Sequence, residues 1–354
     1  MSSFDGTPNT ASSSSSPRRS QHAAGLSLVA VGGGTGLSVL LRGLKHHVGT
    51  RQLRQLTGVV TVTDDGGSSG RLRRELGVLP PGDIRNCLVA LAEVEPLMAE
   101  LFQFRFPGEG QLAGHSFGNL FLAALTHVTG NFLHAIRISG KVLAVRGTIL
   151  PSTLDVVRLG AELADGRRVV GESSIVRQGV PIRRVFLEPG DVRALPEVFE
   201  AIARAHVVVL APGSLYTSLI PNILVGGVAD ALRAAPALKI GVANLMTEPG
   251  ETDGMSLADH LAALHAHGGR GVLDGIVAHG RPFPPDVLAR YARAGASPIA
   301  TDWERVRALG VWLTEADLAS PTELARHHPE KLGRVLARLI RHGGPARRPE
   351  ALRA

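Results

Sequence analysis

The stretch 61–86, TVTDDGGSSGRLRRELGVLPPGDIRN, decides how the rest of the chain is organised. An apolar β-like run over residues 56–62 leads into Asp64 and Asp65, and the turn GGSSG at 66–70 then leads into three arginines. This order is typical of a strand end, a polar loop and a helix start. In open parallel sheets ligands bind outside the carboxyl ends of the strands, so the stretch predicts an α/β fold with a recognition site at this loop.

A glycine-rich turn lies upstream of this stretch. The buried-strand pattern LSLVAV, residues 26–31, runs into GGGTG at 32–36 and then into the helical pattern LSVLLRGLKHH. Glycines let the backbone approach a ligand closely, and free amides at a helix start favour an anion. The turn is not a Walker A loop, because no lysine follows in the required place, and Leu37 replaces the third glycine of GxGxxG. The predicted ligand contacts are Gly33, Gly34, Thr35 and Gly36.

The acid pair and the turn behind it are the next candidates. Asp64 follows the glycine turn by about thirty residues, roughly the distance at which a dinucleotide-type fold places an acid on ribose. If the strand continued, Asp64 and Asp65 would face opposite ways, so one would point into the site, and we favour Asp64. Ser68 and Ser69 are also candidates for ligand binding. Alternatively, one of them caps the following helix, and the stretch is then an ordinary capped turn. Arg71, nearest the loop, is the best candidate for an anion contact.

A second polar turn, PPGD at 80–83, precedes a predicted helix over residues 84–93. Asp83 is as well suited to capping that helix as to catalysis. Arg85 lies in the first helical turn, where a cation opposes the macrodipole, so its position indicates a paired acid or a bound anion. Asn86 lies beside it. We include Arg85 and Asn86 among the ligand-binding candidates.

The motif GHSFGN at 114–119 follows a predicted helix over 95–104 and opens an apolar helix over 120–128. His115 and Asn119 can face a ligand. Alternatively, Ser116 with Asn119 can simply satisfy the helix start, and a lone histidine is about as often structural as functional. From 141 to 190 the pattern changes to short β-like runs with turns at Asp165-Gly166 and Gln178-Gly179, which predicts a β-rich insertion without a catalytic constellation.

The pattern of a parallel sheet then returns. A strand over 205–211 ends in PGSLYTS, a helix is predicted over 223–234, and a strand over 239–243 ends in Asn244. A helix over 256–266, a strand over 271–278, a helix over 303–309, a strand over 311–314 and a closing helix containing Arg326, His327 and His328 complete the pattern. Polar loops after three strands are expected of a doubly wound site. The candidates in this half are Gly213, Ser214, Tyr216, Thr217 and Asn244.

The composition excludes several classes of protein. With 44% hydrophobic and 19% charged residues the chain resembles a globular protein, with a Ser-rich, disordered tail expected over 1–24 and a basic tail over 341–354. The net charge of +7 is scattered, without a basic patch and interleaved aromatics, so we expect no nucleic-acid partner. No apolar run approaches the ~20 residues of a membrane span. One cysteine, Cys87, excludes an intramolecular disulfide and favours the cytoplasm, and no Cys or His cluster predicts a metal.

Five motifs together resemble one family: GGGTGLSVLLRGLK, VTVTDDGGSSGRLRRELGVLPPGDIRN, GHSFGNL, APGSLYTSLIPN and NLMTEPGET. They are similar, in the same order, to the bacterial gluconeogenesis factors, which bind nucleotide sugars and are distant relatives of 2-phospho-L-lactate transferase. The resemblance covers about residues 26–340. It implies one Rossmann-like α/β domain over 25–340 that binds UDP-sugars such as UDP-N-acetylglucosamine. By position, the C-terminal ligand-contacting Tyr and Arg of the family resemble Tyr291 and Arg326. Thr63 departs from the usual Ala.

Two functions from different classes follow from the sequence. The resemblance implies a non-catalytic regulator, needed for growth on gluconeogenic carbon and for cell shape, with protein partners in wall synthesis or central metabolism. We expect a homo-oligomer that requires no cofactor. The alternative is a phospholactyl-type transferase that uses a nucleotide diphosphate donor, with Asp64 or Asp65 holding Mg²⁺ or orienting the acceptor. The aromatic-poor loops offer little for a flavin-like acceptor to stack on, which favours the regulator.

Overall fold

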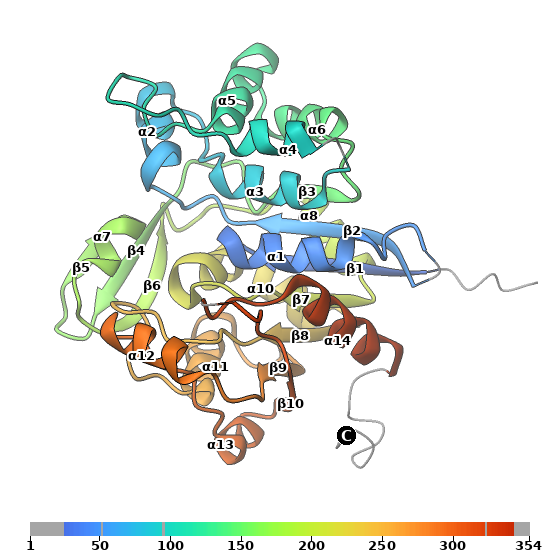
Figure 1. Cartoon of the computed structure of the whole chain (residues 1–354), viewed down its shortest axis with the longest axis vertical. Helices are drawn as coiled ribbons and strands as arrows, with labels where there is room; N and C mark the ends of the chain where they lie inside the picture. Colours follow the sequence, from blue (N-terminus) through green and yellow to red (C-terminus); the bar gives the residue numbers. More distant parts are fainter. Residues whose placement is uncertain (1–24, 51, 94–95, 323, 343–354) are drawn as a thin grey trace, which may run out of the picture.

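A seven-stranded parallel sheet forms the centre of the molecule (Figure 1). The computed structural model describes residues 25–50, 52–93, 96–322 and 324–342. The strand order is β10-β9-β8-β7-β1-β2-β3, and every pairing is parallel. The strands are β1 (Leu26–Gly32), β2 (Leu53–Val60), β3 (Thr148–Pro151), β7 (Val207–Leu210), β8 (Leu238–Val242), β9 (Gly275–His279) and β10 (Trp312–Ala316).

The strand order reverses direction between β1 and β7. From β1 the chain proceeds outward through β2 to β3, then returns to β7 on the other side of β1 and proceeds outward again to β10. Loops after β1 and β7 therefore leave the sheet in opposite directions and open a crevice at this switch point. The predicted doubly wound fold is confirmed, and the topology fixes where a ligand is expected.

Both faces of the sheet are covered by helices. Four consecutive β1 residues, Leu28–Val31, are at most 2% exposed, which requires cover on both sides because successive side chains point to opposite faces. One group of packed helices consists of α1 (Gly34–Lys45), α3 (Gly82–Leu91) and α14 (Pro329–His342). A second group contains α8 (Pro196–Arg204), α9 (Ile220–Leu224), α10 (Val228–Ala234) and α11 (Leu257–Gly268).

Two additions to the sheet are inserted between β2 and β7. A helical unit packs together beside α3, uppermost in Figure 1, and its rings Phe102 and Phe121 meet edge to face at 5.1 Å. Its members are α2 (Gly67–Leu76), α4 (Pro96–Gln103), α5 (Phe117–Thr129) and α6 (Phe132–Val142). The second addition is an antiparallel sheet in the order β5-β4-β6, with α7 (Glu172–Val176) in the connection after β5. Its strands are β4 (Arg158–Leu163), β5 (Arg168–Val170) and β6 (Ile182–Glu188).

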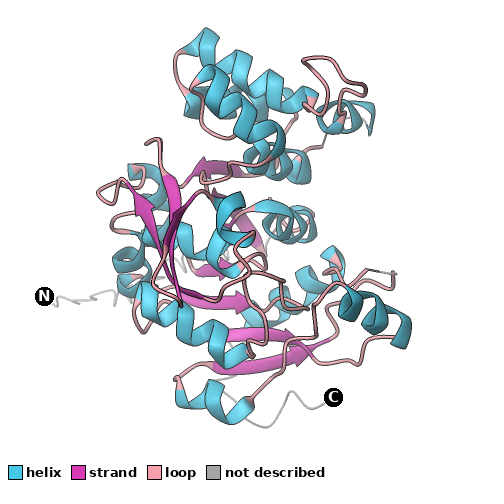
Figure 2. Cartoon of the chain, turned by 90° about the vertical axis from the view of Figure 1, so that its left-hand side faces the viewer, coloured by secondary structure: helices cyan, strands magenta, loops and turns pink. Residues whose placement is uncertain are grey.

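The small sheet and α7 lie at the end of the molecule toward which the β2 arrow points, and Figure 2 looks onto that end. The predicted β-rich insertion is thus confirmed, but it begins later than residue 141. Lys141 and Val142 complete α6, whose start is capped by the Asn131 side chain, and residues 148–151 are β3 of the main sheet. The parallel pairing of β3 with β2 cannot be read from a short apolar run alone.

Several helix boundaries differ from prediction. Pro81 is the N-cap of α3, so Asp83 lies inside the first turn and does not cap the helix. The predicted helix over 223–234 divides between the end of α9 and α10, and Gly227 adopts a left-handed φ of 88° directly before α10. The π-helix η1 (Leu215–Leu219), which precedes α9, was not predicted. Residues 326–328 precede α14, and Arg341 belongs to it.

The remaining helices are α12 (Pro285–Arg293), which follows β9 in the chain, and α13 (Trp303–Ala308), which packs against β10. The predicted tail over 1–24 lies outside the described residues. So does the predicted basic tail over 341–354, apart from residues 341 and 342, which end α14. Across the part of the chain that the structure describes, no helix is long and apolar enough to cross a membrane.

Candidate functional site

The glycine turn lies at the switch point, at the start of α1. Gly33 is the N-cap of α1 and has no side chain of its own to bond the first amides of the helix. A Cβ on Gly36 would lie 1.8 Å from the Pro212 carbonyl oxygen of the loop after β7. A Cβ on Gly33 would lie 2.5 Å from Cγ2 of Thr61. The glycines therefore let the loops after β1, β2 and β7 meet at the crevice.

Carboxyl groups form the wall next to this turn. Asp83 accepts a hydrogen bond from the Gly34 amide, and its burial together with the charge of Asp64 raises its pKa to about 6. Asp64 Oδ1 accepts from the Gly66 amide at 2.9 Å. Burial, and then the charges of Asp64, Asp83 and Asp65, raise the pKa of Glu172 on α7 well above its ordinary value. These acids crowd one side of the crevice, so a ligand there meets hydrogen-bond acceptors rather than cations.

Asp65 serves a different role from Asp64. Its Oδ1 accepts from both the backbone amide and the hydroxyl of Ser173, at 2.9 and 2.7 Å. Asp65 therefore ties the loop after β2 to α7 of the small insertion. This division matches the expectation that one acid of the pair is structural.

No group of three His, Cys, Asp or Glu side chains within the described ranges is arranged to hold a metal ion. Magnesium in phosphate sites is commonly held by one or two carboxylates together with the phosphates of the substrate. Asp64 and Asp83 are near enough for the charge of Asp64 to raise the pKa of Asp83, so they are the two carboxyl groups that such a shared ion would use.

The predicted residues of α2 and α5 form a buried hydrogen-bonded network. Ser68 Oγ lies 3.0 Å from Nδ1 of His115 and accepts from Asn119 Nδ2 at 3.1 Å. Ser69 Oγ accepts from the Gly82 amide at 3.1 Å. The predicted capping of α2 by a serine is wrong, because Gly66 is its N-cap and both serines lie within the helix. The hydroxyls instead fasten α2 to α5 and α3. Ser116 does cap α5, by accepting from the Asn119 amide.

The predicted arginines differ in their contacts. Arg71 donates through Nη2 to the Ala113 carbonyl at 2.6 Å, and so secures the loop before α5. Arg85 is 4% exposed and donates through Nη2 to Asn86 Oδ1 at 2.7 Å, while its Nε and Nη1 have no partner among the described residues. Burial and the charge of Arg105 lower the pKa of Arg85 to about 10. A buried cation with free donors is costly unless an anion reaches it.

Replacing Arg85 by Met tests this cost. We expect the unfolding free energy to rise by about 1 kcal/mol, because an apolar side chain of similar length removes a buried, incompletely paired charge. If Arg85 serves a bound anion, ligand affinity falls about tenfold in the same variant. Chemical denaturation and calorimetry measure the two effects. Arg204→Met, at an exposed surface pair, is the control. A large loss of stability in Arg85→Met would contradict the expectation.

The loop after β7 is held by the segment after β8. The Asn244 side chain accepts from the Gly213 amide at 2.8 Å and donates to the Gly213 carbonyl at 2.9 Å. Glu248 accepts from the Ser214 hydroxyl, and Glu251 accepts from the amides of Tyr216 and Thr217. Sequence reasoning identified the loop but missed these two acids. The run NLMTEPGET directly after a buried strand was the available signal, since acids there lie at the same sheet edge.

A pocket of about 240 Å³ opens beside Asn244, at the carboxyl ends of β8 and β9. Its walls include Arg281, Thr301 and the rings of His279 and Phe283, whose centroids are 4.8 Å apart and whose planes are tilted by 44°. Leu288 of α12 also lines it.

The two predicted C-terminal contacts come from segments near this pocket. Tyr291 is half-buried on α12, one helical turn from Leu288. Arg326 is exposed, and its neighbour His327 lies 3.1 Å from the carbonyl of Ala243, another lining residue. Whether either side chain binds a ligand stays a prediction.

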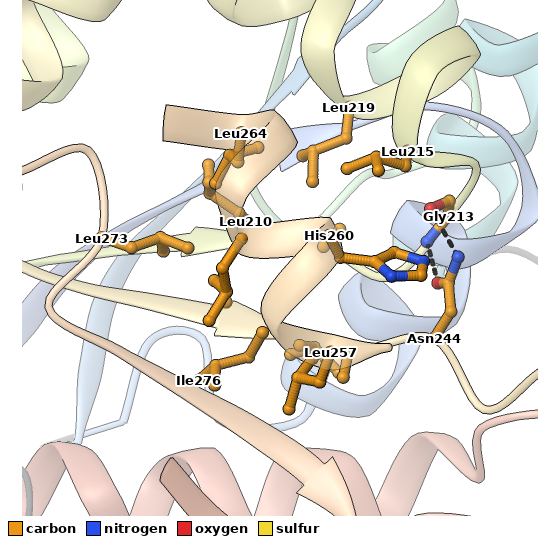
Figure 3. A pocket seen from close by; sticks show the side chains of 15 residues that line it. Leu210, Gly213, Leu215, Leu219, Asn244, Leu257, His260, Leu264, Leu273 and Ile276 are labelled. Atoms are coloured by element: carbon orange, nitrogen blue, oxygen red, sulfur yellow. Dashed lines mark hydrogen bonds between the residues drawn. The ribbon is translucent and has the colours of Figure 1, made fainter. Parts of the chain in front are cut away.

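Behind the loop after β7 lies a small apolar cavity of about 40 Å³ between the sheet and α11 (Figure 3). The His260 ring points toward Gly213 and Asn244. Its Nδ1 lies 2.8 Å from the Ser256 carbonyl, and its buried Nε2 has no described partner. The volume is far below the several hundred Å³ of small-molecule pockets, so this cavity is an internal void behind the site.

The fold and crevice define a Rossmann-like α/β protein with a glycine turn at its switch point. A family model described as "2-phospho-L-lactate transferase CofD" matches residues 28–319, and the chain belongs to this family, within its group of gluconeogenesis factors. It is 48% identical over 310 residues to the "Gluconeogenesis factor" of Halalkalibacterium halodurans. The aligned region covers 87% of this chain and 95% of that protein. The "Gluconeogenesis factor" of Bacillus subtilis is 46% identical over 311 residues, covering 88% and 96%.

A crystal structure of a Bacillus halodurans protein is similar throughout. It is 47% identical in sequence and superimposes with a TM-score of 0.85, covering 88% of this chain and 99% of that chain. The family resemblance stated from the five motifs is thereby confirmed.

Proposed function

We propose that this chain is a regulatory protein that binds a nucleotide sugar of the UDP-N-acetylglucosamine type in the switch-point crevice. The observation that carries the proposal is the close approach between the glycine turn at the start of α1 and the loop after β7. Helix amides and close-approach glycines suit a diphosphate. Acting in the cytoplasm, the protein would pass the level of this precursor to enzymes of central metabolism or wall synthesis, and so support growth on gluconeogenic carbon and normal cell shape.

The pocket between β8 and β9 suits the nucleoside end of such a ligand. It lies two strand spacings from the β1 and β7 junction, about 10 Å, which is comparable with the distance between the phosphates and the base of a nucleotide. The rings of His279 and Phe283 offer surfaces for a base, and Arg281 and Thr301 offer polar contacts. The sugar would then lie toward the acids of the other half, where Asp64 and Asp83 can accept its hydroxyl groups.

Calorimetric titration with UDP-N-acetylglucosamine, UDP, and adenine and guanine nucleotides tests the proposal. We expect saturable binding with a preference for uridine ligands. Equal affinity for all nucleotides, or none, would reject a UDP-sugar regulator.

Replacing Asp64 by Ala tests the acid wall. The single backbone contact of its carboxylate, with Gly66, is local, so we expect stability to change by less than about 1 kcal/mol while affinity for UDP-N-acetylglucosamine falls about tenfold. Asp191→Ala, at an exposed position, is the matched control. Wild-type affinity in the Asp64 variant would remove this residue from the binding site.

The acid wall and the family model also favour a second candidate, a phospholactyl-type transferase. Mg²⁺ would supply charge neutralisation next to Asp64 and Asp83, and the residues of the chain would position the nucleotide donor. Incubation with the nucleotide diphosphate donor, a deazaflavin acceptor and Mg²⁺ tests this candidate. Absence of product at saturating concentrations would leave the regulator as the function.

A further inference from the structure

The start of the π-helix η1 is already occupied by a carboxyl group of the chain itself. Glu251 Oε1 accepts from the Tyr216 amide at 2.7 Å and from the Thr217 amide at 3.3 Å, and Oε2 accepts from the Thr217 hydroxyl at 3.2 Å. Free amides at a helix start are the groups that commonly bind phosphate. In the loop 212–218 two of them are occupied before any ligand arrives.

The environment of Glu251 makes this placement costly. Glu251 is 6% exposed, and no described Lys, Arg or His forms an ion pair with it. The charged or titratable groups that act on it are Glu248 of its own segment, Glu172 of α7 and Tyr216 of η1. Burial first, and then the charge of Glu248, raise the pKa of Glu251 to about 7. A carboxyl group kept in such surroundings needs a compensating role, since desolvation of a charge is unfavourable.

The neighbouring contacts indicate what that role is. Asn244 holds both backbone groups of Gly213, and Glu248 accepts from the Ser214 hydroxyl. With Glu251 at Tyr216 and Thr217, the segment 244–251 satisfies the polar groups along one side of the loop after β7. The opposite side of that loop touches the glycine turn, where the Pro212 carbonyl faces Gly36.

We propose that Glu251 is a positioning residue, whose carboxylate fixes the start of η1 and thereby the shape of the loop 212–218 that forms one wall of the crevice. Because its carboxyl group occupies these amides, they are not available to a ligand phosphate. Glu251 itself does not contact the ligand. This inference rests on the proposed nucleotide site for its effect on affinity, but its effect on the loop is independent of that site.

The test compares Glu251→Ala, Glu251→Gln and the exposed control Glu304→Ala in the full chain. Backbone hydrogen exchange at Tyr216 and Thr217 is followed by NMR or mass spectrometry, and affinity for UDP-N-acetylglucosamine by calorimetry. We expect Glu251→Ala to accelerate exchange at these amides at least about tenfold and to weaken binding about tenfold, because each lost hydrogen bond frees its donor. Glu251→Gln keeps an acceptor oxygen at the amides and should restore most of both properties. The control should change neither.

Each outcome decides the inference. Unchanged exchange in Glu251→Ala would overturn it, and so would faster exchange with unchanged affinity. If Glu251→Gln and Glu251→Ala changed amide exchange and affinity equally, the inference would also be overturned. The acceptor oxygen that Gln retains would then make no difference, as expected of a general packing defect. If Glu251→Ala does not fold, the exchange and affinity of Glu251→Gln decide, with near wild-type values expected. If the wild-type protein binds no uridine ligand, the proposed function fails, and the exchange measurement alone judges whether Glu251 holds the loop.

Discussion

We expect Gly36→Ala to destabilise the protein by about 3 kcal/mol and to abolish binding of the proposed nucleotide sugar. The added methyl group would lie 1.8 Å from the Pro212 carbonyl oxygen and 2.5 Å from its carbon, both of them backbone atoms that cannot rotate away. The start of α1 must therefore separate from the loop after β7, which opens the crevice at its centre. Urea denaturation and calorimetry measure the two effects.

Gly110→Ala is the matched control for this substitution. Gly110 has no atom within 4 Å of its added Cβ and no left-handed φ, so we expect stability to change by less than about 0.5 kcal/mol. Equal stability of the Gly36 and Gly110 variants would contradict the close approach of the two loops.

Asp83→Asn stabilises the protein at neutral pH but not in acid. The folded-state pKa of Asp83, about 6, lies above its ordinary value of 3.8, so the native state binds more protons than the unfolded state between these values. The unfolding free energy of the wild type therefore falls as the pH rises through this window, by about 3 kcal/mol in total from this group. Asn keeps an oxygen for the Gly34 amide and carries no charge, so it removes that loss.

Denaturation of both proteins between pH 4 and pH 8 measures whether the unfolding free energy of the wild type falls as the pH rises, and over which pH range it does so. The stability advantage of Asp83→Asn should be smallest at pH 4, grow up to about pH 6 and then stay constant. The exposed Asp191→Asn is the control and should show no such growth. An advantage that is constant across the range would mean that the Asp83 carboxyl is not perturbed in the native state.

Local patterns predicted the main sheet and the crevice well. The apolar runs before the glycine turn, before Asp64 and before Pro212 are strands β1, β2 and β7, because buried parallel strands are almost continuously apolar. Loops after such strands meet at one edge, so the glycine turn and the Pro-Gly-Ser loop could be placed together from sequence alone.

What local patterns missed depends on contacts between distant segments. The sequence around Asp83 resembled an N-cap, but Pro81 is the N-cap of α3. The Asp83 carboxyl instead accepts a hydrogen bond from the Gly34 amide. Ser68 resembled a cap and instead bonds His115 and Asn119, about fifty residues away. Glu251 carries no local mark of its role, because its partners lie thirty-four and thirty-five residues earlier. Such partners become visible only when the strand order is known.

The pairing of β1 with β7 also has a consequence for how the chain folds. Ser27 donates its amide to Nδ1 of His206, 179 residues later, so the junction at the centre of the crevice closes the longest loop between neighbouring strands of the sheet. Strands β7 to β10 can pair through local βα connections first, whereas closing a long loop is slower and entropically costly. The crevice is then among the last parts of the molecule to assemble. A ligand that contacts both the glycine turn and the loop after β7 would stabilise the pairing of β1 with β7. It would therefore slow unfolding that begins by separation of these two strands.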